Sequence, residues 1–193
     1  MIMKVLNTVF CASLILSSLC NAALAESAQE AGYPPYVKDK KLHATRDLRG
    51  KKAPAIKVAQ WVSGSLPDRK GKVTLIEFWA TWCPDCHRAR PILNKFQEKF
   101  GADLVSVGIS DEPEDVIKKY LEKNPVDFSV ASAPDKKMYK TVGVKGIPLV
   151  LVVSADGIVR WEGYIDSKED PLTEDKLAQI IKASQSSKSR KVH

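Results

Sequence analysis

The chain has 193 residues, of which 30 are Lys or Arg and 23 are Asp or Glu, giving a formal net charge of +7 at pH 7. This length suits one domain with a substantial hydrophobic core and is short for two. The basic excess, including Lys40 and Arg49, lies towards the two ends of the chain. Such runs are typical of solvated tails, and the alternative is weak contact with an acidic membrane surface or an acidic partner.

The first 25 residues have the order of a secretory signal peptide. Lys4 precedes an almost uncharged stretch, residues 5–24, and Ala23-Leu24-Ala25 has the small-x-small pattern of a cleavage site. We expect cleavage after Ala25, because polar residues dilute the stretch and disfavour the alternative of a retained membrane anchor. The mature protein is therefore predicted to be exported to the periplasm, which argues against a nucleic-acid partner.

Three further segments are expected after the signal peptide. Residues 26–50 lack apolar periodicity and contain Gly32, Pro34 and Pro35, so they are predicted to be a flexible leader. The folded domain is expected over residues 51–185, and residues 186–193 are expected to form a basic disordered tail.

Strands and helices alternate along the predicted domain. Residues 73–80 form a nearly continuous apolar run, interrupted only by Glu77, which is typical of a central strand buried on both faces. The Ala155-Asp156-Gly157 turn predicts a hairpin between strands at 149–153 and 158–164. Helices are expected at 84–100, 114–121, 135–141 and from Thr173 onward, with further strands at 104–109 and 128–131. This order predicts an α/β fold with a mixed sheet covered by helices.

A cysteine pair lies where the first predicted strand passes into a helix. If the signal peptide leaves, Cys83 and Cys86 are the only cysteines. One C-x-x-C pair cannot complete a four-cysteine zinc site, and the loop it closes is too small for the disulfide to stabilise the fold much. A redox-active disulfide is therefore the interpretation that remains. Because a helix N-terminus favours a thiolate, Cys83 is expected to attack and Cys86 to resolve, with no metal or other cofactor.

The motif around this pair resembles thioredoxin. Residues 78–86 read FWATWCPDC, Pro91 follows, and Gly146-Ile147-Pro148 precedes a strand and hairpin. The resemblance covers about residues 54–181, and an extra helix and strand before Gly146 resembles the exported TlpA/ResA branch. It implies a thioredoxin-like fold in which a cis Pro148 lies beside the cysteines and Ile147 presents main-chain groups to an extended substrate segment. The contacts with substrate would be completed by Trp82, Pro84 and Asp85.

Glu77 resembles the buried acid of thioredoxin. Burial can raise the pKa of a carboxyl from near 4.3 towards the cysteine value near 8.5. We therefore hypothesise that Glu77 accepts the proton of Cys86 during resolution. The alternative is a strand glutamate that reaches solvent or pairs with a lysine.

Asp85 bears on the direction of electron flow. A helix terminus stabilises an exposed thiolate by about 0.3–1 kcal/mol, which a carboxylate two residues from Cys83 would offset. Strong oxidants depend on an unusually stable reduced thiolate, so the Pro-Asp insert, which lacks a histidine, favours a reductant or an enzyme of mid-range potential. The resemblance implies oxidised exported proteins as substrates, with apocytochrome c as one candidate, and a membrane thiol-disulfide electron donor.

Three alternatives accompany this prediction. A disulfide-forming or isomerising enzyme would use the same site, and a copper carrier of related fold would use His87 as a third ligand. A peroxiredoxin-type peroxidase is disfavoured because Ile76 and Ala80 occupy the positions of its proline and threonine.

Overall fold

The computed structural model describes residues 32–190, so the predicted signal peptide and residues 26–31 of the predicted leader lie outside the described part. The elements expected from the apolar patterns are present, and apart from the end of the last helix their boundaries lie within about two residues of those predicted. They are β1 (Gln60–Ser63), β2 (Val73–Trp79), α2 (Pro84–Phe100), β3 (Leu104–Ser110), α3 (Glu114–Leu121), β4 (Ser129–Ser132), α4 (Lys137–Val142), β5 (Leu149–Val153), β6 (Val159–Gly163) and α5 (Glu174–Arg190). Only the short strand β1 has no counterpart among the predictions.

The described strands form one mixed sheet in the order β1-β4-β3-β2-β5-β6. Strands β2, β3 and β4 are parallel, since α2 and α3 carry the chain back between them. Strand β5 is antiparallel to β2 and to β6, and β1 is antiparallel to β4. The predicted mixed sheet flanked by helices is thus confirmed, and the predicted hairpin joins β5 to β6.

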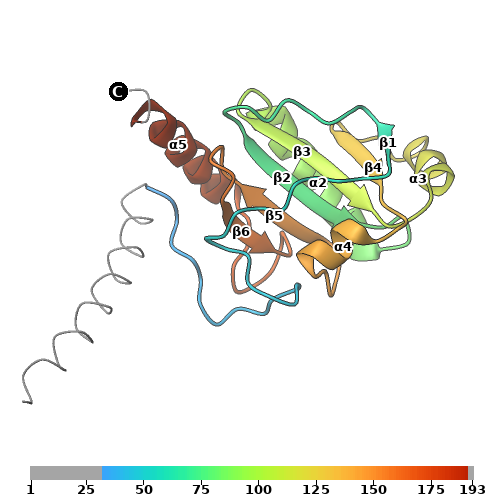
Figure 1. The fold of residues 1–193 in the computed structure, drawn as a ribbon, viewed down its shortest axis with the longest axis horizontal. Helices are drawn as coiled ribbons and strands as arrows, with labels where there is room; N and C mark the ends of the chain where they lie inside the picture. The colour runs from blue at the N-terminus through green and yellow to red at the C-terminus, as the bar shows by residue number, and fades with distance from the viewer. Residues whose placement is uncertain (1–31, 191–193) are drawn as a thin grey trace, which may run out of the picture.

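Both faces of the sheet are covered. Helices α2 and α5 pack on one face, in a buried cluster that includes Leu75, Leu93, Phe96, Leu177 and Ile180. Helix α4 and part of the N-terminal segment pack on the other, in a cluster that includes Leu48, Ile76, Phe78, Met138 and Val142. Figure 1 shows α5 beside β6 and α3 at the opposite end of the sheet, beside β1.

Strand β2 positions the cysteine pair. It lies in the middle of the sheet, and all seven of its residues are buried. Its carboxyl end leads through a short loop directly into α2, which begins at Pro84. In open α/β sheets this end of a parallel strand is where ligand sites form.

The prediction of a flexible leader is wrong for residues 33–50, which we call the strap. Tyr33, Ala44 and Leu48 are buried in the strap. The main-chain nitrogen of Thr45 donates to the carbonyl oxygen of Gly143 at 2.7 Å. The strap therefore belongs to the folded domain, which begins before the predicted residue 51.

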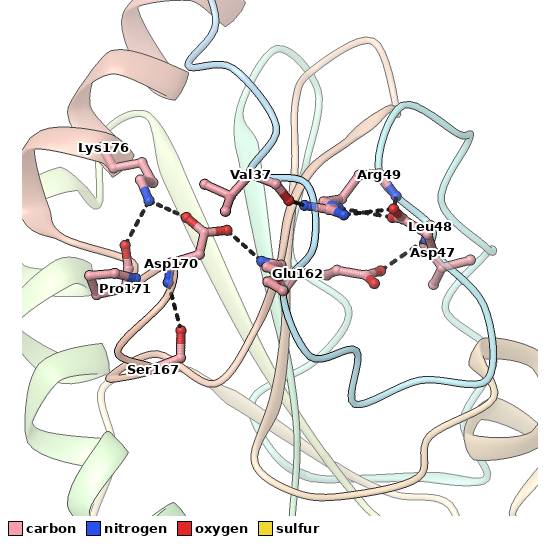
Figure 2. Close-up of polar contacts among 10 residues, drawn as sticks. Val37, Asp47, Leu48, Arg49, Glu162, Ser167, Asp170, Pro171 and Lys176 are labelled. Carbon is pink, nitrogen blue, oxygen red and sulfur yellow. Dashed lines mark hydrogen bonds and ion pairs between the residues drawn. The ribbon is translucent and has the colours of Figure 1, made fainter.

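Charged side chains fix the strap to β6 and to the loop before α5 (Figure 2). Asp170 accepts hydrogen bonds from Lys40, at 2.5 Å, and from Lys176. Lys40 also donates to the carbonyl oxygen of Glu162, whose carboxylate accepts from the main-chain nitrogen of Leu48 at 3.0 Å. Lys40, predicted to lie in a solvated tail, has a side chain only 4% exposed. Its partners lie more than 100 residues away, so no local pattern reveals its burial.

The C-terminal boundary also differs from the prediction. Residues 186–190 continue α5 instead of forming a disordered tail, and residues 191–193 lie outside the described range. The hydroxyls of Ser186 and Ser187 each donate to a carbonyl oxygen four residues earlier, at 3.0 Å. These bonds satisfy the serine hydroxyls within the helix. None of the helices in residues 32–190 has the length and apolar character needed to cross a membrane.

Candidate active site

Cys83 and Cys86 form a disulfide at the N-terminus of α2, with their Cα atoms 5.3 Å apart. Cys83 is the N-cap residue, and its Sγ accepts a hydrogen bond from the main-chain nitrogen of Cys86 at 3.2 Å. Cys83 is 3% exposed and Cys86 is fully buried, so the disulfide meets the surface only through Cys83. The same N–H group would stabilise a thiolate on Cys83.

The loop before β5 lies against this disulfide. The Ile147–Pro148 peptide bond is cis, as predicted, and the carbonyl oxygen of Ile147 lies 3.9 Å from Cys83 Sγ. The strap supports this loop, because the main-chain nitrogens of Lys145 and Gly146 donate to the carbonyl oxygen of His43 at 2.8 and 3.3 Å. The cysteines and the proline loop, 60 residues apart in sequence, are thereby brought together.

A pocket of about 440 Å³ opens beside Cys83. Five of the predicted site residues line it, and Trp82 among them is 68% exposed. The pocket residues are Trp82, Cys83, Pro84, Asp85, Tyr139, Val144, Lys145, Gly146, Ile147 and Tyr164. Tyr164 is stacked on His43 of the strap, with ring centroids 3.5 Å apart. Pro148, the residue after Ile147, is buried and is not among the residues that line the pocket.

Glu77 lies inside the sheet on β2, between Gly108 of β3 and Val150 of β5. It is 1% exposed, and neither carboxylate oxygen has a hydrogen-bond partner in the described part of the chain. Burial raises its pKa to about 8, although the nearby charge of Arg90 lowers it in part. The predicted burial is observed, and the alternative of a solvent-reaching or lysine-paired glutamate is wrong.

Two residues near the cysteines were missed by sequence reasoning. Glu112, after β3, accepts hydrogen bonds from the main-chain nitrogen and the hydroxyl of Thr81, both at 2.6 Å, and so fixes the loop before Cys83. Arg90 is buried in α2, one turn after Cys86. Arg90 lies three residues before the buried Leu93, so helical spacing could have revealed its burial, whereas nothing local linked Glu112 to Thr81.

Asp85 and His87, the polar residues on either side of Cys86 in the sequence, lie at the surface. Asp85 pairs with Arg88 at 2.5 Å, both side chains being about half exposed or more. The Nε2 atom of His87 lies 2.7 Å from the carbonyl oxygen of Thr81, and its ring stacks on Tyr120. Within residues 32–190 no three His, Cys, Asp or Glu side chains are grouped as a metal site would require.

Known proteins resemble most of this chain. A family model described as Redoxin matches residues 48–181. The thiol-disulfide oxidoreductase ResA of Bacillus thuringiensis subsp. konkukian is 28% identical over 131 residues, covering 66% of this chain and 69% of ResA. The thiol:disulfide interchange protein HelX of Rhodobacter capsulatus is 30% identical over 142 residues, covering 69% of this chain and 75% of HelX. The solved structure of a thiol:disulfide interchange protein of the thioredoxin family from Chlorobium tepidum matches with a TM-score of 0.56 at 25% identity. The match covers 72% of this chain and 99% of the Chlorobium chain.

The matched region holds the whole candidate site. Residues 48–181 include the disulfide, Glu77 and the cis-proline loop. That α3 and β4 are an insertion relative to thioredoxin stays a prediction. The chain therefore belongs to the Redoxin family and is a thiol-disulfide oxidoreductase of the ResA type, with a thioredoxin-like fold.

Proposed function

We propose that the protein is a periplasmic reductase of disulfides in exported proteins, cycling between a Cys83/Cys86 dithiol and the disulfide. One observation carries the proposal: the disulfide at the N-terminus of α2 lies 3.9 Å from the Ile147 carbonyl oxygen, beside an open pocket. A client segment lying in this pocket would meet Cys83 first, because Cys86 is fully buried. The redox-active disulfide is the only cofactor that the proposal needs.

The first step is attack on the client. The Cys83 thiolate attacks one sulfur of the client disulfide, the client S–S bond breaks, and a mixed disulfide between Cys83 and the client forms. The second client sulfur leaves as a thiolate and takes a proton from solvent. The Ile147 main chain would hold an extended client segment in the pocket, with Trp82, Pro84 and Asp85 along its wall. The cis Pro148 would fix the main chain of Ile147 for this contact.

The second step is resolution by Cys86. Its thiol gives a proton to the Glu77 carboxylate, and the resulting thiolate attacks Cys83 Sγ. The bond between Cys83 and the client breaks, the client leaves as a thiolate, and the Cys83–Cys86 disulfide forms, so two electrons have passed to the client. Glu77 suits this role because its pKa, raised by burial to about 8, is close to that of a cysteine thiol.

Reduction is favoured over oxidation because little around Cys83 stabilises its thiolate beyond the helix terminus. The negative charge of Asp85 disfavours a thiolate on Cys83, and the ion pair of Asp85 with Arg88 reduces this effect. No histidine lies between the two cysteines. We therefore infer a Cys83 thiol of modest acidity and a potential nearer to that of thioredoxin than to that of a strong oxidant.

Export and recharging complete the proposal. The pattern of residues 1–25 supports a signal peptide that is cleaved after Ala25. A reductant in an oxidising compartment needs a supply of electrons, which a membrane thiol-disulfide donor would provide. Apocytochrome c is the candidate client suggested by the TlpA/ResA resemblance.

Trapping the mixed disulfide tests this function. Without the resolving thiol, Cys86→Ser should accumulate a covalent complex with a disulfide-bonded probe such as insulin, visible on a non-reducing gel. The matched variant Cys83→Ser should form at least tenfold less, since its remaining sulfur is buried. Wild-type protein should accelerate insulin reduction by dithiothreitol, and no acceleration together with no complex in Cys86→Ser would contradict the proposal.

A further inference from the structure

Arg90 is a buried cation near the start of α2. It lies in α2 four residues after Cys86, so the two side chains share one side of the helix. The residue is 7% exposed, and its Nε and Nη1 atoms are buried without a hydrogen-bond partner among residues 32–190. Burying a guanidinium without such partners is costly, which makes a functional role worth seeking.

Aromatic rings hold the guanidinium in place. Its Cζ atom lies 4.5 Å from the ring centroid of Trp79 on β2 and 4.9 Å from that of Tyr120 on α3. Desolvated contacts of this kind with a cation are favourable. Trp79 and Cys86 belong to the same buried cluster, so Arg90 packs against the cluster that contains the resolving cysteine.

Glu77 is the acid on the same side of the sheet as Arg90. It lies two residues before Trp79 on β2, so both side chains project from the same face of the sheet. Both Glu77 oxygens are also buried and without partners in the described structure. Arg90 and the ionisable carboxyl of Glu77 thus lie on the side of the sheet where Cys86 lies, without a direct salt bridge between them in the described structure.

We propose that Arg90 is a positioning residue for the resolving step, whose buried charge acts on Glu77 so that Glu77 can take the Cys86 proton near neutral pH. This inference rests on the proposed function, in which that proton moves from Cys86 Sγ to the Glu77 carboxylate. A fixed positive charge in a poorly solvated region stabilises the carboxylate strongly. Without it, burial alone would keep Glu77 protonated to higher pH.

The other groups around Glu77 do not supply this charge. Beside it in the sheet are Gly108 of β3 and Val150 of β5, and neither has a charged side chain. From α4, Tyr139 donates its hydroxyl to the carbonyl oxygens of Trp79 and Ile109, and burial raises its pKa, so it stays neutral. Besides burial, the charge of Arg90 is what acts on the pKa of Glu77, and it lowers that pKa.

A two-step thiol assay tests the proposal. Reduced protein is mixed with the aromatic disulfide dithionitrobenzoate in a stopped-flow instrument: attack by Cys83 releases one coloured thiolate, and resolution by Cys86 releases a second. In wild-type protein the second release should have a pH midpoint near that of Glu77, about 8. In Arg90→Met the midpoint should rise, and the second release should be about tenfold slower at neutral pH, while the first changes much less.

Two matched variants make the result specific. Arg90→Lys keeps the buried charge, and its second release should stay within about threefold of wild type. A tenfold slower second release in folded Arg90→Lys would overturn the proposal even if Arg90→Met did not fold. Lys95→Met removes an exposed cation from the same helix and should leave both releases unchanged. An unchanged midpoint in folded Arg90→Met would also overturn it.

A double-variant cycle separates this inference from the proposed function. If Arg90 acts through Glu77, Arg90→Met should have little further effect on the second release in a Glu77→Gln background. If Arg90→Met slowed the second release equally in the wild-type and Glu77→Gln backgrounds, action through Glu77 would be refuted. Failure of the proposed function would look different, since wild-type protein itself would then not show two releases.

Discussion

Burial of Glu77 makes the stability of the oxidised protein depend on pH. Its pKa in the folded protein, about 8, is above the ordinary value of 4.5, because burial disfavours the carboxylate. The folded protein therefore keeps a proton that the unfolded chain releases between these values. The resulting stability is fully present below about pH 4.5 and is lost as the pH rises through about 8.

Replacing Glu77 with Gln should remove this dependence. The free energy of unfolding of Glu77→Gln, relative to wild type, should increase by about 3 kcal/mol between about pH 5 and about pH 8, because only the wild type loses stability in this window. Urea denaturation of the oxidised proteins at both pH values measures the difference. Glu98→Gln, an exposed substitution on α2, should show no such change. The same difference for Glu77→Gln at both pH values would mean that Glu77 titrates normally.

Among the elements, the strap depends most on buried charge. The carboxylate of Asp170 is buried between Lys40 and Lys176 (Figure 2). Burial alone would raise the pKa of Asp170, but the hydrogen bonds from both lysines hold it below its ordinary value. The strap in turn supports the cis-proline loop through His43, so this ion cluster connects the stability of the domain with the wall of the pocket.

Removing the anion of this cluster should detach the strap. Asp170→Asn leaves Lys40 with a buried uncompensated charge and should lower the free energy of unfolding by about 3 kcal/mol at neutral pH. Hydrogen exchange should show loss of protection at Thr45, Lys145 and Gly146, whose main-chain nitrogens donate within this contact. Asp127→Asn, which removes an exposed carboxylate, serves as the control. Unchanged protection in Asp170→Asn would show that the strap is held by its apolar residues.

At the scale of the whole molecule, the sequence predicted what local patterns encode. Strands β2 and β5 and helix α2 followed from apolar periodicity, and the cysteine motif placed the site at the start of α2. The cis Pro148 required the family resemblance, since the local sequence alone gives an X–Pro bond only a cis chance of about 5%.

What escaped prediction depends on contacts between distant residues. The strap is ordered by Asp170, 130 residues from Lys40, and by main-chain bonds to residues 143–146. Strand β1, only four residues long, is defined by its pairing with β4 at an edge of the sheet. Glu112 reaches Thr81 only because β2 and β3 are neighbours. Arg90 lies on the same side of the sheet as Glu77 only because α2 packs against β2.

The central claim is that Cys83 and Cys86 form a reducing, exchangeable pair, and a redox titration tests it most directly. The mature protein is equilibrated with dithiothreitol or glutathione buffers while tryptophan emission is followed, because buried Trp79 lies in the same cluster as both cysteines. We predict one reversible two-electron transition with a potential more negative than about −180 mV, towards that of thioredoxin at about −270 mV. A potential near that of the oxidant DsbA, about −120 mV, or no reversible transition, would contradict the account.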